Sequence, residues 1–423
     1  MKTFTKVAIA LCMVCALAVP AMAVDADFSG QYRVRGFFND NVYSTDLDAS
    51  SAWMDMRLRM QTVFTVSDNL KLTTRFDALD NKNWGDGDLN TGRDADNIDF
   101  DRAYMTIKTG YGQFDVGRMA KAAFGTVFFD SGTEADRIKY TLPIDNFTLL
   151  AIYQKNTEND KNDGVTGAGL TAADEDSDSY LLAGTYKAEN YTTGLLYVFN
   201  PNKTVPTQDT TLHTLNPYFI GTFGALGIEA ELKYIFGTTD YDAAGVQDLD
   251  KDAMAFQIEG TYDLGVAKIE AGYGFFSGDN DATDNDDEAF TDGFGDDWEK
   301  VWILTNSTDE FSNINLSKTG MGTTGSTAGA NLFYVGASYA PIENLTLGVL
   351  IAYAEADAAP AGWDDEYGME YDFKLNWKIY DNLSYSFIAA FLDAGDFFKQ
   401  GVANPANYDD SSYALYNALV LNF

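Results

Sequence analysis

The chain lacks the long apolar runs of a helical membrane protein. Its longest apolar stretch, residues 7–20, is too short to span a bilayer as a helix, and no later stretch approaches the required length of about 18 residues. If the chain crosses a membrane, it must do so with strands, because only helices and closed barrels satisfy every backbone polar group in lipid.

Cysteine and histidine are almost absent. Cys12 and Cys15 both lie in residues 1–23, so the rest of the chain has no disulfide and no thiolate metal site, which suits an oxidising compartment. His213 is the only histidine; a Ser–His hydrolase would depend on it, but its strand-like segment T-L-H-T-L favours a structural role. No phosphate-binding loop, G-x-S-x-G motif or haem-attachment motif occurs, so we expect neither an enzyme nor a resident cofactor.

Basic residues are scarce beside acidic ones. Lys and Arg number 28 and Asp and Glu number 64, which gives a formal net charge of −36. Nucleic acid is therefore disfavoured as a partner, because phosphate binding requires a basic face. The acidic segments 248–252 and 279–288 lack the glycine and terminal Glu of an EF-hand loop, so we expect loose divalent-cation binding there rather than a tight calcium site.

Both ends of the chain have features of an exported barrel. Residues 1–23 read as a secretory signal, with Lys2 and Lys6 before an apolar region and A-M-A at its end. We expect cleavage there, leaving residues 24–423 as a single domain. The last segment, Y-A-L-Y-N-A-L-V-L-N-F, alternates and ends on an aromatic residue, which is typical of outer-membrane β-barrels.

Apolar and polar residues alternate along the whole chain between these ends. Alternation with period two predicts strands, and a charged face opposite an apolar one is the pattern of a transmembrane barrel. We count about eighteen such segments. They are residues 28–38, 52–66, 70–79, 99–109, 112–118, 136–142, 146–155, 178–188, 191–200, 211–222, 226–236, 252–263, 266–277, 329–340, 345–355, 367–379, 383–393 and 411–423.

The connections between these segments alternate in length. Short turns rich in Asp and Asn, such as 67–69 and 380–382, alternate with long acidic loops such as 80–98, 156–177 and 278–328. This predicts an all-β, transmembrane, antiparallel up-and-down barrel of 16–18 strands, with turns at the periplasmic rim and the long loops outside. A soluble β-sandwich is the alternative, but it would not sort its loops in this way.

The early strands place several arginines on the parity predicted to face the lumen. Neighbouring strands lie about 5 Å apart, so these side chains would form a basic ladder along one wall, partly offset by Asp55 and Asp77. The ladder could line a pore, or its arginines could hold the barrel together through ion pairs, and the two roles are compatible. The arginines are Arg33, Arg35, Arg57, Arg59, Arg75 and Arg102.

The connection 119–135 is unusually apolar for a loop. It contains Phe124, Phe128 and Phe129 and few charges, so we expect it to fold into the barrel, pack its rings on the wall and turn Asp130 and Glu134 toward the opening. The alternative is an apolar loop tip at a subunit contact.

A resemblance to a known family rests on the segment around this loop. Residues 97–119, N-I-D-F-D-R-A-Y-M-T-I-K-T-G-Y-G-Q-F-D-V-G-R-M, resemble the trimeric porins of Gram-negative bacteria, with matches at Arg102, Ala103, Tyr104, Gly112, Phe114, Gly117 and Arg118. The resemblance implies a homotrimer in which 119–135 is the constriction loop. It also implies that Asp130 and Glu134 face the arginine ladder across a narrow waist. The late hairpin 368–383 resembles substrate-specific export and uptake barrels.

We therefore predict an outer-membrane porin that passes ions and small hydrophilic solutes by passive diffusion. Its partners would be outer-membrane lipid and lipopolysaccharide. One alternative is a substrate-specific channel for anionic or sugar-like solutes, guided by the arginines. Another is a structural or adhesive barrel whose long loops bind a surface partner.

Overall fold

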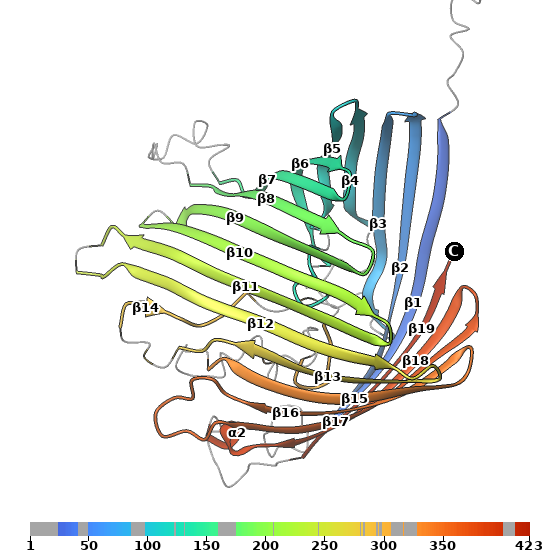
Figure 1. Ribbon diagram of the computed structural model, residues 1–423, viewed down its shortest axis with the longest axis vertical. Helices are drawn as coiled ribbons and strands as arrows, with labels where there is room; N and C mark the ends of the chain where they lie inside the picture. The colour runs from blue at the N-terminus through green and yellow to red at the C-terminus, as the bar shows by residue number, and fades with distance from the viewer. Residues whose placement is uncertain are drawn as a thin grey trace, which may run out of the picture.

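The strands of the chain form one closed barrel in the computed structural model (Figure 1). The structure describes residues 24–40, 50–85, 98–121, 124–130, 132–159, 175–205, 207–243, 245–279, 281, 284–292, 295, 298–305, 316, 328–400 and 411–423. The predicted signal, residues 1–23, lies outside the described residues, as do parts of the long loops.

Eighteen long antiparallel strands follow one another around the barrel in chain order. The first pairs with both the second and the last, with Arg33 opposite Arg57 on one side and Val420 on the other, and this pairing closes the sheet. The first nine are β1 Asp25–Asp40, β2 Ser50–Ser67, β3 Leu70–Asn83, β4 Ile98–Thr109, β5 Gly112–Ala120, β6 Glu134–Ile144, β7 Phe147–Thr157, β8 Ser177–Lys187 and β9 Tyr191–Val205. The others are β10 Gln208–Phe223, β11 Leu226–Tyr241, β12 Leu249–Asp263, β13 Ala267–Phe276, β15 Ala330–Ile342, β16 Leu345–Glu355, β17 Glu366–Tyr380, β18 Leu383–Ala394 and β19 Ser411–Asn422.

The prediction of an all-β barrel of 16–18 strands is confirmed, and each of the eighteen alternating segments coincides with one long strand. A short strand, β14 (Asp286–Asp287), pairs with the start of β12, and a short helix, α2 (Asp396–Gln400), follows β18. Among the described residues, no helix is long and apolar enough to cross a membrane.

The outward face of the barrel is apolar, as the alternation predicted. Leu182 is 62% exposed and Val335 is 56% exposed, although both lie in the middle of long strands. A continuous surface of such residues would be unfavourable in water, whereas it is the expected surface in lipid.

The inward face differs between the two halves of the barrel. From β1 to β11 it carries buried polar side chains, including Arg35, Asp55, Asp77, Asn216 and Glu231. From β12 to β19 it is mostly small and apolar. Its buried alanines are Ala253, Ala255, Ala330, Ala352, Ala354, Ala390, Ala394, Ala414 and Ala418.

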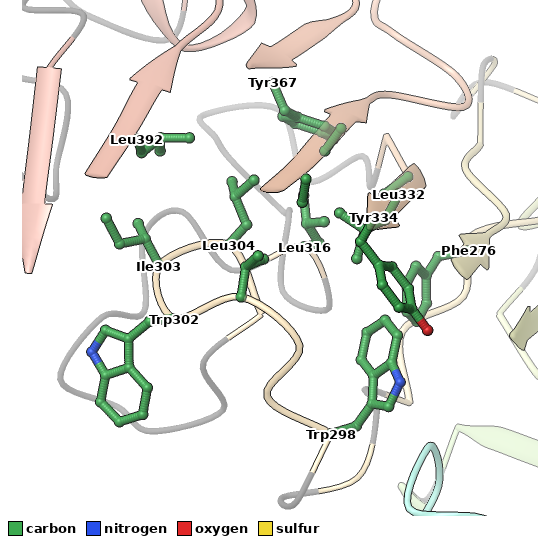
Figure 2. Close-up of a cluster of buried hydrophobic side chains, with 14 of the residues drawn as sticks. Phe276, Trp298, Trp302, Ile303, Leu304, Leu316, Leu332, Tyr334, Tyr367 and Leu392 are labelled. Atoms are coloured by element: carbon green, nitrogen blue, oxygen red, sulfur yellow. The ribbon is translucent and has the colours of Figure 1, made fainter. Parts of the chain in front are cut away.

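Residues 298–305 of the connection between β13 and β15 lie inside the barrel against its apolar half, so the prediction that this whole loop lies outside is wrong. Residues 298–305, here called the plug segment, include Trp298, Val301, Ile303 and Leu304, none of which has any exposed area. Figure 2 shows Ile303 and Leu304 pointing toward the wall residues Leu392 and Tyr367. The reason is the segment's sequence, W-E-K-V-W-I-L-T, whose apolar side chains are buried against the alanine-lined wall.

Candidate constriction site

Residues 119–135, here called the constriction loop, join β5 to β6 and run across the lumen. Thr126 donates hydrogen bonds from its backbone nitrogen and its hydroxyl to Oε2 of Glu231 on β11, at 2.7 and 2.6 Å. Asn216 on β10 donates to the other carboxylate oxygen at 2.9 Å, which holds the acceptor in place. Phe124 packs edge-on against Tyr218, also on β10, with ring centroids 5.0 Å apart. The loop, which starts from β5 and β6, is therefore fixed to the wall formed by β10 and β11.

The tip of the constriction loop meets the loop that carries the plug segment. Phe128 is fully buried, with its ring 4.7 Å from that of Trp298 and 5.6 Å from that of Phe276 on β13. The backbone nitrogen of Gly295 donates to the carbonyl of Phe128 at 2.6 Å. These two loops thus form one continuous structure, here called the partition, which crosses the barrel interior.

Two carboxylates of β17 anchor the plug segment. Glu370 accepts hydrogen bonds from the backbone nitrogens of Ile303 and Leu304, at 2.5 and 2.8 Å. Asp372 accepts one from the backbone nitrogen of Trp302 at 2.8 Å. Buried backbone N–H groups that lack a partner are costly, and these two acids satisfy three consecutive ones in a segment without regular secondary structure.

Further contacts fix the other end of the plug segment to β12 and β17. The indole nitrogen of Trp298 donates to Gln257, and Lys300 forms an ion pair with Glu259. Lys374 donates to the carbonyl of Lys300 at 2.8 Å. Figure 2 shows Trp298 beside the rings of Phe276 and Tyr334 at this end.

The six predicted arginines lie on neighbouring strands β1 to β4, on the inward parity, and are here called the arginine wall. Each has a polar partner nearby. Arg35 forms a two-pronged ion pair with Asp55, and Arg59 forms one with Asp77, at 2.7 and 2.6 Å. Arg33 donates to the side chain of Asn81 at 2.9 Å.

Acidic side chains also neutralise the positive charges of the other three arginines in the wall. Arg57 lies 3.9 Å from carboxylate oxygens of both Asp77 and Asp80. Arg75 pairs with Asp101 at 3.0 Å and also with Glu134, which in turn lies 3.1 Å from Arg102. The wall is therefore an alternating network of charges, in which every described arginine has a specific partner, rather than a purely basic strip.

Glu134 lies closer to the arginine wall than the sequence predicted. Glu134, at the start of β6, contacts Arg75 and Arg102 directly instead of facing them across an open waist. The backbone of Asp130 lies against Gly295 of the loop that carries the plug segment. The physical reason is that burying an unpaired charge is costly, so arginines and carboxylates that lie close together form ion pairs.

Sequence reasoning missed the plug segment and its anchors Glu370 and Asp372. Two signals were available: a heptapeptide with five apolar residues, W-E-K-V-W-I-L, inside an acidic loop, and the alanines on the inward parity of the late strands. The alternation of segment 367–379 places Glu370 and Asp372 on its polar parity but does not indicate which backbone nitrogens they bind.

His213 lies on the outward parity of β10 and stacks on Phe236 of β11, with ring centroids 5.1 Å apart. Its Nδ1 lies 2.7 Å from the hydroxyl of Tyr197. It thus belongs to an aromatic cluster on the outside of the barrel. Within the described ranges, no group of three or more His, Cys, Asp or Glu side chains is arranged to hold a metal ion.

Comparison with known proteins identifies the family. A family model described as Gram-negative porin matches residues 8–295, more than half of the chain. The chain belongs to the Gram-negative porin family. As a porin, it is an outer-membrane channel for the passive diffusion of small solutes. No protein among the curated sequences matches it.

Solved structures similar to this porin are outer-membrane barrels that cover nearly all of it. OccK8 (OprE) of Pseudomonas aeruginosa has 13% identity and a TM-score of 0.57, over 94% of this chain and 98% of its own. OccAB4 of Acinetobacter baumannii has 10% identity and a TM-score of 0.56, over 96% and 99%. A BenF-like porin from Pseudomonas fluorescens Pf-5 has 11% identity and a TM-score of 0.54, over 94% and 99%. At these identities the likeness shows the fold alone.

Proposed function

We propose that solutes cross this porin along the arginine wall, through a constriction formed by the wall and the partition. The observation that carries the proposal is the constriction loop held to Glu231 by Thr126, because it fixes a loop across the lumen beside the charged strands. The plug segment fills the apolar half of the barrel, so the polar half is the side left for water and solutes.

The residues that line this path are the six arginines of the wall together with Glu134, while Asp130 contributes from the constriction loop. Rings and walls of charged side chains set ion preference in channels. Since the arginines alternate with Asp55, Asp77, Asp101 and Glu134, the path would favour small polar solutes and ions of either sign over apolar ones.

Single-channel recording in a planar bilayer under a KCl gradient tests this function. We expect a steady ohmic conductance, with a reversal potential that reports the balance between the arginine wall and the acidic loops. A bilayer that contains folded protein and shows no conductance would contradict the proposal. That result would support the structural or adhesive barrel instead.

Assembly as a homotrimer is part of the proposal and is supported by the resemblance of residues 97–119 to trimeric porins. Light scattering of the protein in mild detergent measures the mass of the assembly. A trimer mass is expected, and a monomer at all concentrations would contradict it.

Catalysis has no place in the proposal, and neither does a resident cofactor. A His-dependent reaction would need His213 beside a nucleophile, whereas its described neighbours are aromatic rings and the Tyr197 hydroxyl. The acidic loops would collect divalent cations loosely, shared with lipopolysaccharide at the outer surface.

A substrate-specific channel is a second proposed function, favoured by one observation. The lumen contains a cavity, beside the constriction loop, that combines several cationic side chains with an apolar floor. This combination of positive charge and apolar surface would favour particular solutes, which a path for general diffusion does not require.

A further inference from the structure

A cavity of about 520 Å³ lies between the constriction loop and the inward faces of β6 to β11. Its size is within the range of sites that enclose small molecules. The loop contributes Phe124 and Phe129 to the cavity wall, so the cavity is a compartment beside the constriction and distinct from the arginine wall on β1 to β4.

Four cationic side chains border this cavity: Lys121, Arg137, Lys139 and Lys233. Lys139 and Lys233 are neutralised by acids. Lys139 pairs with Asp115 at 3.1 Å, and Lys233 pairs with Asp292 at 2.7 Å. Lys233 holds the pKa of the Asp292 carboxyl below its usual value, so that carboxylate stays ionised at neutral pH and continues to compensate the lysine.

Arg137 is different, because it is 7% exposed and makes no ion pair with any described residue. Its Nε donates to Oε1 of Gln154 at 2.6 Å, and its Nη1 donates to the carbonyl of Lys121 at 2.6 Å. Its Nη2 makes no hydrogen bond within the described part of the chain. The other two buried arginines described, Arg35 and Arg75, both have carboxylate partners. Burying a charge is costly unless it is paired, so Arg137 is a cation that lacks its anion.

A chain of neutral side chains holds Arg137 in position. Gln154 accepts from the guanidinium and donates to Asn156, which donates to Ser179 at 2.9 Å. Asn200 donates to the same hydroxyl at 3.1 Å. Because amides and a hydroxyl fix the guanidinium without neutralising it, the site is preorganised to receive a negative group at Nη2.

The rest of the cavity wall opposite these polar groups is apolar. It is formed by inward-facing side chains of β7 to β10. A purely hydrophilic solute would bury none of this apolar surface favourably. They are Leu150, Ile152, Leu181, Leu196, Val198 and Leu212. A ligand that matches both parts has one anionic head and a compact apolar body.

We propose that this cavity is a binding site for small organic monoanions with an apolar body, such as medium-chain carboxylates, with Arg137 as the residue that receives the anionic head. The inference rests on the proposed function only in that ligands reach the cavity through the lumen. Binding and conduction can be measured separately, so failure of one is distinguishable from failure of the other.

Ligand-observed NMR on the full chain in detergent micelles tests the site, with hexanoate as the probe. Acetate has the same head without the body, and hexylammonium has the same body with the opposite charge. We expect saturable binding of hexanoate, weaker binding of acetate, and none of hexylammonium. Arg137→Gln should weaken hexanoate binding about tenfold or more, since it removes a charge-assisted hydrogen bond.

Two further variants make the test specific. Arg118→Gln is the matched control, because Arg118 pairs with Asp136 at 3.4 Å on the outward face, and it should bind hexanoate as the wild type does. Leu181→Asn should weaken hexanoate binding and leave acetate binding unchanged. Equal hexanoate binding by Arg137→Gln and Arg118→Gln would overturn the proposal, and so would equal binding of hexanoate and hexylammonium.

Discussion

Thr126 and Glu231 are 105 residues apart in the sequence, and their side-chain oxygens are 2.6 Å apart across the barrel lumen. This contact fixes the far end of the constriction loop. Gly125, which precedes Thr126, has a φ of 101°. A Cβ added to it would collide with the Glu231 carboxylate, so the chain requires glycine at this position.

Thr126→Val removes the hydroxyl that binds Glu231 and keeps the shape of the side chain. The loop would then be held at this point mainly by one backbone hydrogen bond, and we expect larger current fluctuations in the open channel. Single-channel noise measures the effect. Thr126→Ser, which keeps the hydroxyl, is the comparison variant, and equal noise in the two variants would contradict an anchoring role for the Thr126 hydroxyl.

Glu370→Ala should release the plug segment. It leaves the backbone nitrogens of Ile303 and Leu304 without acceptors, which should cost about 1–3 kcal/mol for each buried group. We expect a lower midpoint of thermal unfolding and a larger, less steady conductance. Glu343→Ala, at an exposed turn, is the control. Unchanged conductance with lowered stability would mean that the plug segment does not restrict the channel.

The inward alanines should tolerate no enlargement. Ala390 is 5% exposed and lies in the wall that the plug segment covers, so Ala390→Leu should destabilise the barrel by about 1–3 kcal/mol through overpacking. Ala337→Leu, on the outward face, should have little effect because it adds apolar area to the lipid surface. Urea unfolding in detergent measures both, and equal losses would contradict the assignment of the two faces.

The double variant Arg57→Ala/Arg59→Ala should shift ion selectivity toward cations. It removes two positive charges and leaves Asp77 and Asp80 without these partners, so the local charge becomes negative. The reversal potential under a KCl gradient measures the shift, with Lys378→Ala at an exposed position as the control. An unshifted reversal potential would place these arginines away from the conducting path.

The barrel could be predicted from the sequence because lipid imposes one requirement on every strand, an apolar side chain at each outward position. Leu182, Val335 and Val349 satisfy it in three different strands, and this repetition gives both the strand count and the closure. The same rule predicted that Arg57 and Arg59 face the lumen.

The partition could not be predicted in the same way, because its contacts join residues that are far apart in sequence. Nothing in the neighbourhood of Thr126 points to Glu231, and the plug segment finds its acceptors Glu370 and Asp372 some 66–70 residues later. The pairing of Glu134 with Arg75 and Arg102 likewise depends on how three strands and a loop end come together. Alternation predicts which face of a strand a side chain occupies, but it does not predict which residues that side chain contacts.

The division of the lumen is tested most directly by modifying single introduced cysteines during channel recording, since residues 24–423 contain no cysteine. Gln61→Cys lies on the inward parity of β2 beside the arginine wall, and Ala390→Cys lies behind the plug segment. A water-soluble, anionic methanethiosulfonate reagent should reduce the current through Gln61→Cys within seconds to minutes and leave Ala390→Cys unchanged. Rapid block of Ala390→Cys, or no effect at Gln61→Cys, would contradict a conducting path confined to the polar half of the barrel.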